Sequence, residues 1–113
     1  MLSKANRLPS YAIPTVLTGG KRAVEGPLLL MFQKNTGGVS RFAFIVPTGS
    51  DKRTTTRNRT RRLLRESVHH QLDHIQAGWD AVIMMKGKLA VDSQGEVDSM
   101  VRSVLLKAGL LRI

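Results

Sequence analysis

The residues with the clearest chemical potential lie between positions 52 and 66, where the sequence reads KRTTTRNRTRRLLRE. Lys and Arg recur through this stretch, and its one acidic residue, Glu66, comes last. Guanidinium groups bind phosphate oxygens through paired hydrogen bonds, and a cluster of like charges is relieved by a polyanion. The stretch therefore indicates a phosphate-binding surface. The alternative is a solvated charged face, which normally interleaves both signs of charge.

A helix would place these side chains together. At about 100° per residue, Leu64, Val68, Leu72 and Ile75 fall within one narrow arc that must face a core. The cationic side chains lie beside this arc or above it in the first turns. The threonines at 54–56 favour a capped helix start, whose free amides also attract anions. The candidate phosphate-binding residues are Lys52, Arg53, Arg57, Asn58, Arg59, Arg61, Arg62 and Arg65.

Composition narrows the class of protein. A chain of 113 residues with 42% hydrophobic residues forms one domain with a modest core. Its net charge of +10 points to polyanionic partners. The chain has no cysteine, so disulfides and thiolate metal sites are excluded. Its longest apolar run, 27–32, is too short to span a membrane, and no secretory signal is visible, so we expect a cytoplasmic location.

The rest of the chain reads as alternating helices and strands. We expect residues 1–10 to form a loosely ordered basic arm. A short helix should follow within 11–18, starting or kinking at Pro14, and then an edge strand over 21–24. The further expected elements are strands at 28–34 and 41–47 paired as an antiparallel hairpin, the arginine helix ending at Gly78, a strand at 79–85 and a helix ending at Ala108, capped by Gly109.

This order predicts an α+β fold, with a mixed sheet and helices packed on one of its faces. Within the strand at 41–47, Phe42, Phe44 and Val46 share one face, whereas Arg41, Ala43 and Ile45 share the other. The three histidines at 69, 70 and 74 lie on one helix without an evident third ligand, so we interpret them as surface residues rather than a metal site.

The arginine helix also carries a family resemblance. Its segment RNRTRRLLRE, residues 57–66, resembles the signature RNRxKRxLRE of the bacterial ribonuclease P protein subunit. Other stretches fall in the order expected for that family. They are Asn6-Arg7-Leu8, Gly20, the strands 28–32 and 41–46, Trp79 to Ile83 with Lys86-Gly87, and the closing segment 105–111.

The resemblance implies an αβββαβα two-layer sandwich whose parallel strands are joined by an unusual left-handed crossover. It implies a protein that binds ribonuclease P RNA through the arginine helix and the 5′ leader of precursor tRNA in a cleft between the first helix and the sheet. Cleavage would be performed by the RNA and its Mg²⁺ ions, with no metal site from the protein alone and no stable protein partner. The residues that we assign to the leader cleft are Tyr11, Ile13, Leu17, Met31, Arg41 and Phe44.

The chain departs from the family pattern in three places. The loop at 47–55 lacks the usual glycine-asparagine turn and is one residue longer. Pro14 falls within the first helix. Ile13, Leu17 and Met31 stand where the family has aromatic residues, and they cannot stack on a base as a ring does. Because stacking contributes about 1–3 kcal/mol per base, we expect weaker or differently placed leader contacts.

Three other functions can be considered for a basic chain of this size. A protein-only nuclease would need clustered carboxylates, and the eight acidic residues form no convincing constellation. A membrane-surface helix is disfavoured because the apolar arc continues into a core pattern shared with the strands. A non-catalytic basic RNA-binding module, such as a ribosomal protein or RNA chaperone, is the open alternative.

Overall fold

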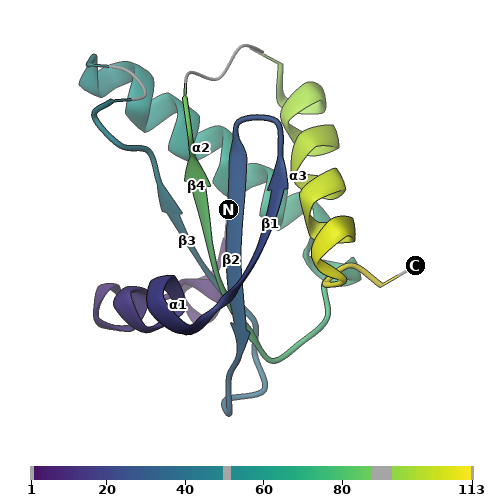
Figure 1. Ribbon diagram of the computed structural model, residues 1–113. Helices are drawn as coiled ribbons and strands as arrows, with labels where there is room; N and C mark the ends of the chain where they lie inside the picture. Colours follow the sequence, from purple (N-terminus) through teal and green to yellow (C-terminus); the bar gives the residue numbers. More distant parts are fainter. Residues whose placement is uncertain (1, 50–51, 88–92, 113) are drawn as a thin grey trace.

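The computed structural model describes residues 2–49, 52–87 and 93–112. These residues form one four-stranded sheet and three helices (Figure 1). In chain order the elements are the short 3-10 helices η1 (Lys4–Asn6) and η2 (Ser10–Ala12), helix α1 (Ile13–Gly19), strands β1 (Lys21–Glu25), β2 (Leu28–Lys34) and β3 (Arg41–Ile45), helix α2 (Thr54–Gln71), the 3-10 helix η3 (Leu72–His74), strand β4 (Trp79–Met85) and helix α3 (Gln94–Ala108).

The sheet order is β1-β2-β4-β3, so β4 lies between the two strands that we expected to pair as a hairpin. The expectation of a β2–β3 hairpin is therefore wrong. β2 pairs with β4 in antiparallel orientation, and β3 pairs with β4 in parallel, with Phe42 opposite Ala81. The run WDAVIMM is almost wholly buried, which suits a central strand covered on both faces.

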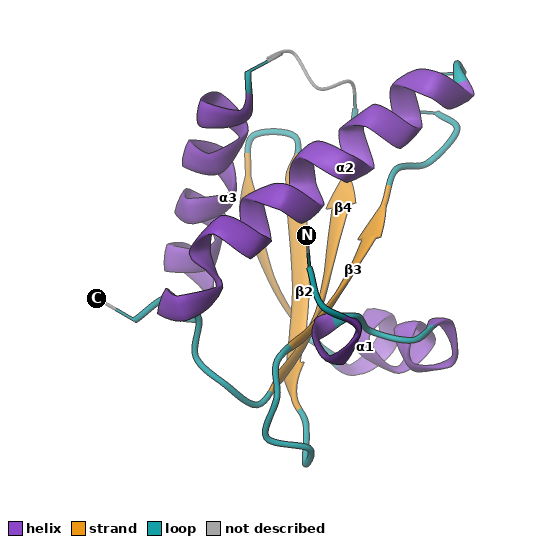
Figure 2. Cartoon of the chain, turned by 180° about the vertical axis from the view of Figure 1, so that it is seen from behind, coloured by secondary structure: helices purple, strands orange, loops and turns teal. Residues whose placement is uncertain are grey.

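Helix α2 connects the two parallel strands. Seen from the helix side, both arrows point upward, β4 lies to the left of β3 and α2 passes in front (Figure 2). This arrangement is a left-handed crossover, whereas about 98% of such connections are right-handed. The unusual hand, which the family resemblance implies, is confirmed.

The helices cover both faces of the sheet, not one face as expected from the order of elements. Helices α2 and α3 pack over the main core, which contains Leu30, Phe42, Leu64, Ile83 and Val101. Helix α1 lies across the opposite face (Figure 1), in a smaller cluster of buried residues. The residues of this second cluster are Leu8, Val16, Met31, Ala43 and Val82.

The N-terminal segment is packed rather than loosely ordered, which corrects our expectation of a basic arm. Leu2 is fully buried in the main core, and Leu8 is buried in the cluster under α1. Two hydrogen bonds tie the segment to β3 and the residue before it. The Leu8 amide donates to the Phe42 carbonyl at 2.8 Å, and Asn6 Nδ2 donates to the Ser40 carbonyl at 2.9 Å. The segment therefore covers the outer edge of β3, because its two leucines are buried on opposite faces of the sheet.

The helix ends differ in part from the sequence prediction. Helix α1 begins at Ile13 with Pro14 in its first turn, as expected. Helix α2 ends at Gln71, before Ile75 and well before Gly78, because η3 and an extended residue intervene. Its N-cap residue is Arg53, which makes no side-chain capping bond, so the expected threonine cap is not formed. Gly109 ends α3 in the left-handed conformation, with φ of 76°, as predicted.

Candidate nucleic-acid interface

Helix α2 separates its apolar and cationic side chains as the sequence predicts. The side chains that it buries against the sheet and α3 include Leu63, Leu64 and Val68. Asn58, Arg59 and Arg62 are exposed on the other side. Arg57, Arg61 and Arg65 are half-buried at the margins, and Lys52 and Arg53 are exposed just before the helix. We call the set Lys52, Arg53, Arg57, Asn58, Arg59, Arg61, Arg62 and Arg65 the arginine ridge.

Contacts within the chain hold several ridge side chains in place. Arg57 Nη1 donates to the Lys52 carbonyl at 3.0 Å, which fastens the segment before the helix to its first turn. Arg61 donates to the Asn58 side-chain oxygen one turn away. The Arg65 guanidinium lies 5.9 Å from the centre of the Phe44 ring, a cation–π contact with β3. The ridge therefore presents partly ordered guanidinium groups to a partner.

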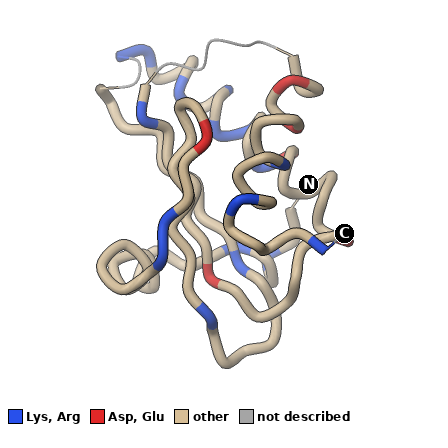
Figure 3. The backbone as a smooth tube through the Cα atoms, turned by 45° about the vertical axis from the view of Figure 1, so that its right-hand side comes forward, with Lys and Arg blue, Asp and Glu red and all other residues tan. Residues whose placement is uncertain are grey.

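Arg62 differs from its neighbours in the ridge. Its side chain is exposed, and it makes no hydrogen bond or ion pair with any residue in the part of the chain that the structure describes. The chain as a whole has few acidic positions with which to neutralise its basic ones (Figure 3). The Arg62 guanidinium therefore faces solvent, where a partner can bind it.

The residues assigned to a leader cleft do not all come together. Ile13 and Leu17 are half-buried on α1, and Met31 beneath them is only 3% exposed. Together with the buried Val16 and Val82, these aliphatic side chains fill the space between α1 and the sheet. Aliphatic packing thus takes the place of a groove lined by rings.

Phe44 is on the wrong face for this cleft. It packs against the main core beneath α2, where Arg65 covers its ring, whereas Ile13, Leu17 and Met31 belong to the opposite cluster. Its assignment to the leader cleft is therefore corrected. The sequence alternation already placed Phe44 opposite to Arg41, and that signal identifies the error.

Arg41 lies on the α1 face of the sheet and is oriented by a buried carboxylate. Its Nε donates to Asp80 Oδ1 at 2.9 Å and its Nη2 to Oδ2 at 2.7 Å. Asn35 Nδ2 also donates to Asp80 Oδ1, at 2.8 Å. Burial alone would raise the pKa of Asp80, but the hydrogen bonds from Arg41 and Asn35 outweigh it and hold that pKa below its ordinary value.

The same ion pair raises the pKa of Arg41, chiefly through the hydrogen bond to Asp80, and the Tyr11 side chain adds to this effect. Tyr11 itself is 83% exposed. Sequence reasoning missed Asp80 as the partner of Arg41. A lone charged residue within the apolar run WDAVIMM was the available signal, because a buried carboxylate must be paired.

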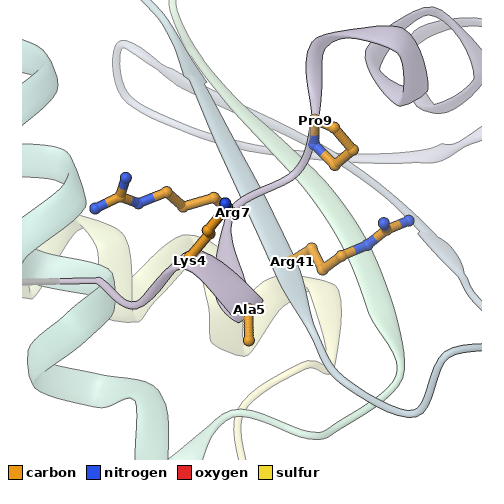
Figure 4. Close-up of a pocket in the computed structure, with 5 residues that line it drawn as sticks. All are labelled: Lys4, Ala5, Arg7, Pro9 and Arg41. Carbon is orange, nitrogen blue, oxygen red and sulfur yellow. The ribbon is translucent and has the colours of Figure 1, made fainter.

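An open hollow of about 480 Å³ lies beside Arg41 and was not predicted. Its walls come from the N-terminal segment and from β3 (Figure 4). The Arg7 guanidinium is fixed by hydrogen bonds to the Leu2 carbonyl, from Nε at 3.2 Å and from Nη2 at 3.1 Å. The residues that line the hollow are Lys4, Ala5, Arg7, Pro9 and Arg41.

Comparison with known proteins gives one family. The model of the ribonuclease P family matches residues 2–109. The ribonuclease P protein component of Dehalococcoides mccartyi is 33% identical over 111 residues, which cover 97% of this chain and 90% of that protein. The corresponding protein of a Thermoanaerobacter species is 27% identical over 101 residues, covering 89% and 86% of the two chains.

Solved structures give the same family. The RNase P protein from Thermotoga maritima matches with a TM-score of 0.79 at 26% identity, over 90% of this chain and 96% of that one. An RNase P protein structure from Staphylococcus aureus shares the fold, with a TM-score of 0.82 at 16% identity over 96% of this chain and all of that one. The chain therefore belongs to the ribonuclease P family, as the protein component of the ribonucleoprotein endonuclease that matures the 5′ end of tRNA.

Proposed function

We propose that the arginine ridge binds ribonuclease P RNA and that the α1 face of the sheet contacts the 5′ leader of precursor tRNA. The observation that supports the first part is the outward-facing row of cations on α2, anchored by Leu63, Leu64 and Val68. Paired RNA strands offer phosphates at groove-like spacing, so a rigid cationic helix reads their shape more than their sequence. Each phosphate contact adds to the salt dependence of binding.

The reaction itself is assigned to the RNA. Among residues 2–49, 52–87 and 93–112, no three His, Asp or Glu side chains converge on a point where they could hold a metal ion. We propose that Mg²⁺ is held mainly by RNA, whose phosphate oxygens together with water suit this ion. The protein's part is to neutralise phosphates and to hold both RNAs in place, which raises the affinity for substrate.

The place of action follows from this role. Precursor tRNA is processed where it is made, so we propose that the protein acts in the bacterial cytoplasm. Among the described residues, no helix is both long enough and apolar enough to cross a bilayer.

Reconstitution tests the proposal. The purified protein is added to its ribonuclease P RNA at low Mg²⁺ concentration, and the cleavage rate of precursor tRNA is compared with that of the RNA alone. We expect strong stimulation by the protein and none by an equally basic ribosomal protein. Equal stimulation by both would favour the non-catalytic basic RNA-binding module instead.

A further inference from the structure

Of the Phe, Tyr and Trp residues, only Tyr11 is exposed, and it is not among the residues packed between α1 and the sheet. All five aromatic residues lie in the described part of the chain, and four of them, Phe32, Phe42, Phe44 and Trp79, pack into or against the main core under α2 and α3. Tyr11 is the exception, at 83% exposed. Tyr11 is therefore the one exposed ring among the Phe, Tyr and Trp residues. The exposed rings of His69, His70 and His74 lie on α2 and η3 and do not line the hollow.

Tyr11 stands next to fixed cationic and apolar surface. It lies in η2, two residues after Pro9, which lines the hollow. It is also close enough to Arg41 to influence its ionisation. The two hydrogen bonds to Asp80 fix the plane of the Arg41 guanidinium. Bases stack on guanidinium planes as well as on rings.

The hollow has the size and character of a nucleotide site. Its volume of about 480 Å³ falls within the range typical of small-molecule sites, about 300–1,000 Å³. In Figure 4, the guanidinium groups of Arg7 and Arg41 point away from each other, toward opposite sides of the hollow, with Pro9 and Ala5 bounding it above and below. The walls are thus apolar and the rim is cationic, which suits a base or sugar flanked by phosphates.

The position of the hollow also suits an RNA strand that follows the protein surface. The N-terminal segment crosses the β3 edge from the main core, at Leu2, to the cluster under α1, at Leu8. Because Arg41 lies on the α1 face and also lines the hollow, a leader strand bound on that face can continue into the hollow. Lys4 is exposed there, beside the hollow.

We propose that one nucleotide of the precursor tRNA leader binds at the β3 edge, with its base on Tyr11 and its flanking phosphates at the rim formed by Lys4, Arg7 and Arg41. This inference rests on the proposed function and adds to it the location of the stacking contact. Asp80 is a positioning residue, because it acts through Arg41. The site takes the place of the groove that Ile13, Leu17 and Met31 fill.

The test uses the reconstituted holoenzyme and a precursor tRNA made uncleavable by a 2′-deoxy substitution at the cleavage site. 2-Aminopurine is placed singly at successive leader positions, because its fluorescence falls when it stacks. We expect quenching at one position with the wild type and with Tyr11→Phe, and recovered fluorescence with Tyr11→Ala. Tyr11→Ala should also weaken leader-dependent affinity at least about fivefold.

Two more variants test the hollow and its rim. Ala5→Leu adds bulk at an exposed position and should weaken leader binding, whereas Ser99→Leu on α3 should not. Lys4→Gln should lower the salt slope of leader binding by about 0.7, the loss of one single-strand phosphate contact. Arg102→Gln removes the same charge from α3 and should leave the slope unchanged. Affinities for ribonuclease P RNA and for tRNA without a leader should not change in any variant.

The outcomes separate the two proposals. If the wild type binds precursor tRNA more tightly than leaderless tRNA but Tyr11→Ala and Ala5→Leu change nothing, the site at the β3 edge is wrong and the leader contact lies elsewhere. Loss of quenching in Tyr11→Phe as well would also overturn stacking, because the hydroxyl would then be responsible. If the wild type does not distinguish the two tRNAs, the proposed leader contact itself fails.

Discussion

Asp80 on β4 holds Arg41 on β3 by a two-point ion pair, with Nε to Oδ1 at 2.9 Å and Nη2 to Oδ2 at 2.7 Å. The carboxylate side chain is 8% exposed and the arginine side chain 31% exposed, so this pair joins the parallel strands at the margin of the core. It stabilises the sheet and aims one cation at the α1 face at the same time.

Replacing Asp80 by Asn should destabilise the fold. The change leaves the Arg41 guanidinium near a buried neutral amide, and breaking such a pair costs about 2 kcal/mol when one partner is partly exposed. Urea denaturation at pH 7 measures the loss. Asp73→Asn, at an exposed position on η3, is the matched control and should change the free energy of unfolding by less than about 0.5 kcal/mol.

The Asp80 contribution should depend on pH in one direction. Its pKa is lowered in the folded state, so the folded protein releases that proton more readily than the unfolded chain. The stabilisation is therefore complete above the unfolded pKa of about 4 and is lost as pH falls through the folded pKa. The difference in unfolding free energy between wild type and Asp80→Asn should shrink below about pH 4. A difference that stayed constant down to pH 2 would show that the carboxylate charge does not matter.

Gly20 should not tolerate even one methyl group. A Cβ at this position would lie 2.6 Å from the Val16 carbonyl oxygen and 3.0 Å from the Phe32 carbonyl oxygen. Because both neighbours are backbone atoms, Gly20→Ala should cost about 1–3 kcal/mol in unfolding free energy. The neighbouring Gly19→Ala is the control, since its Cβ would meet only the Gln33 side chain at 3.4 Å. Equal effects of the two changes would contradict the close approach at Gly20.

Arg65→Ala should combine two losses. The side chain covers the Phe44 ring, so its removal should lower the unfolding free energy by about 0.5–1 kcal/mol. As a member of the arginine ridge it should also contribute to RNA affinity. Thermal unfolding and RNA titration on the same preparation measure both. An Arg65→Ala protein of full stability would show that the ring contact contributes nothing.

Much of the fold could be predicted from sequence, because local patterns are strong here. The run at 28–34, the strand at 79–85 and the Gly109 cap come from apolar runs and turn chemistry that act over a few residues. Strand order could not be obtained that way. The short loop after β2 favours a hairpin, but β4 takes the place beside β2 because its nearly all-buried side chains need cover on both sides.

The candidate site also has one part that the sequence could predict and another that it could not. The arginine ridge could be predicted because helical periodicity places Arg59 and Arg62 on the flank beside the apolar arc that contains Leu64 and Val68. The Asp80–Arg41 pair and the hollow depend on contacts between residues far apart in the chain, and no local spacing encodes them. The polar and basic composition of residues 1–10 predicts a loosely ordered arm, whereas the burial of Leu2 and Leu8 on two faces of the sheet fixes that segment.

The most direct test of the account is the salt dependence of binding between ribonuclease P RNA and the Arg62→Ala protein. Arg62 is exposed and makes no hydrogen bond or ion pair within the described part of the chain, so the melting temperature of the Arg62→Ala protein should match that of the wild type. Affinity should fall, and the slope of log K against log salt should become shallower by about 0.9, whereas Arg102→Ala on α3 should leave both unchanged. Unchanged RNA affinity together with a lower melting temperature would contradict the claim that the arginine ridge is the RNA-binding surface.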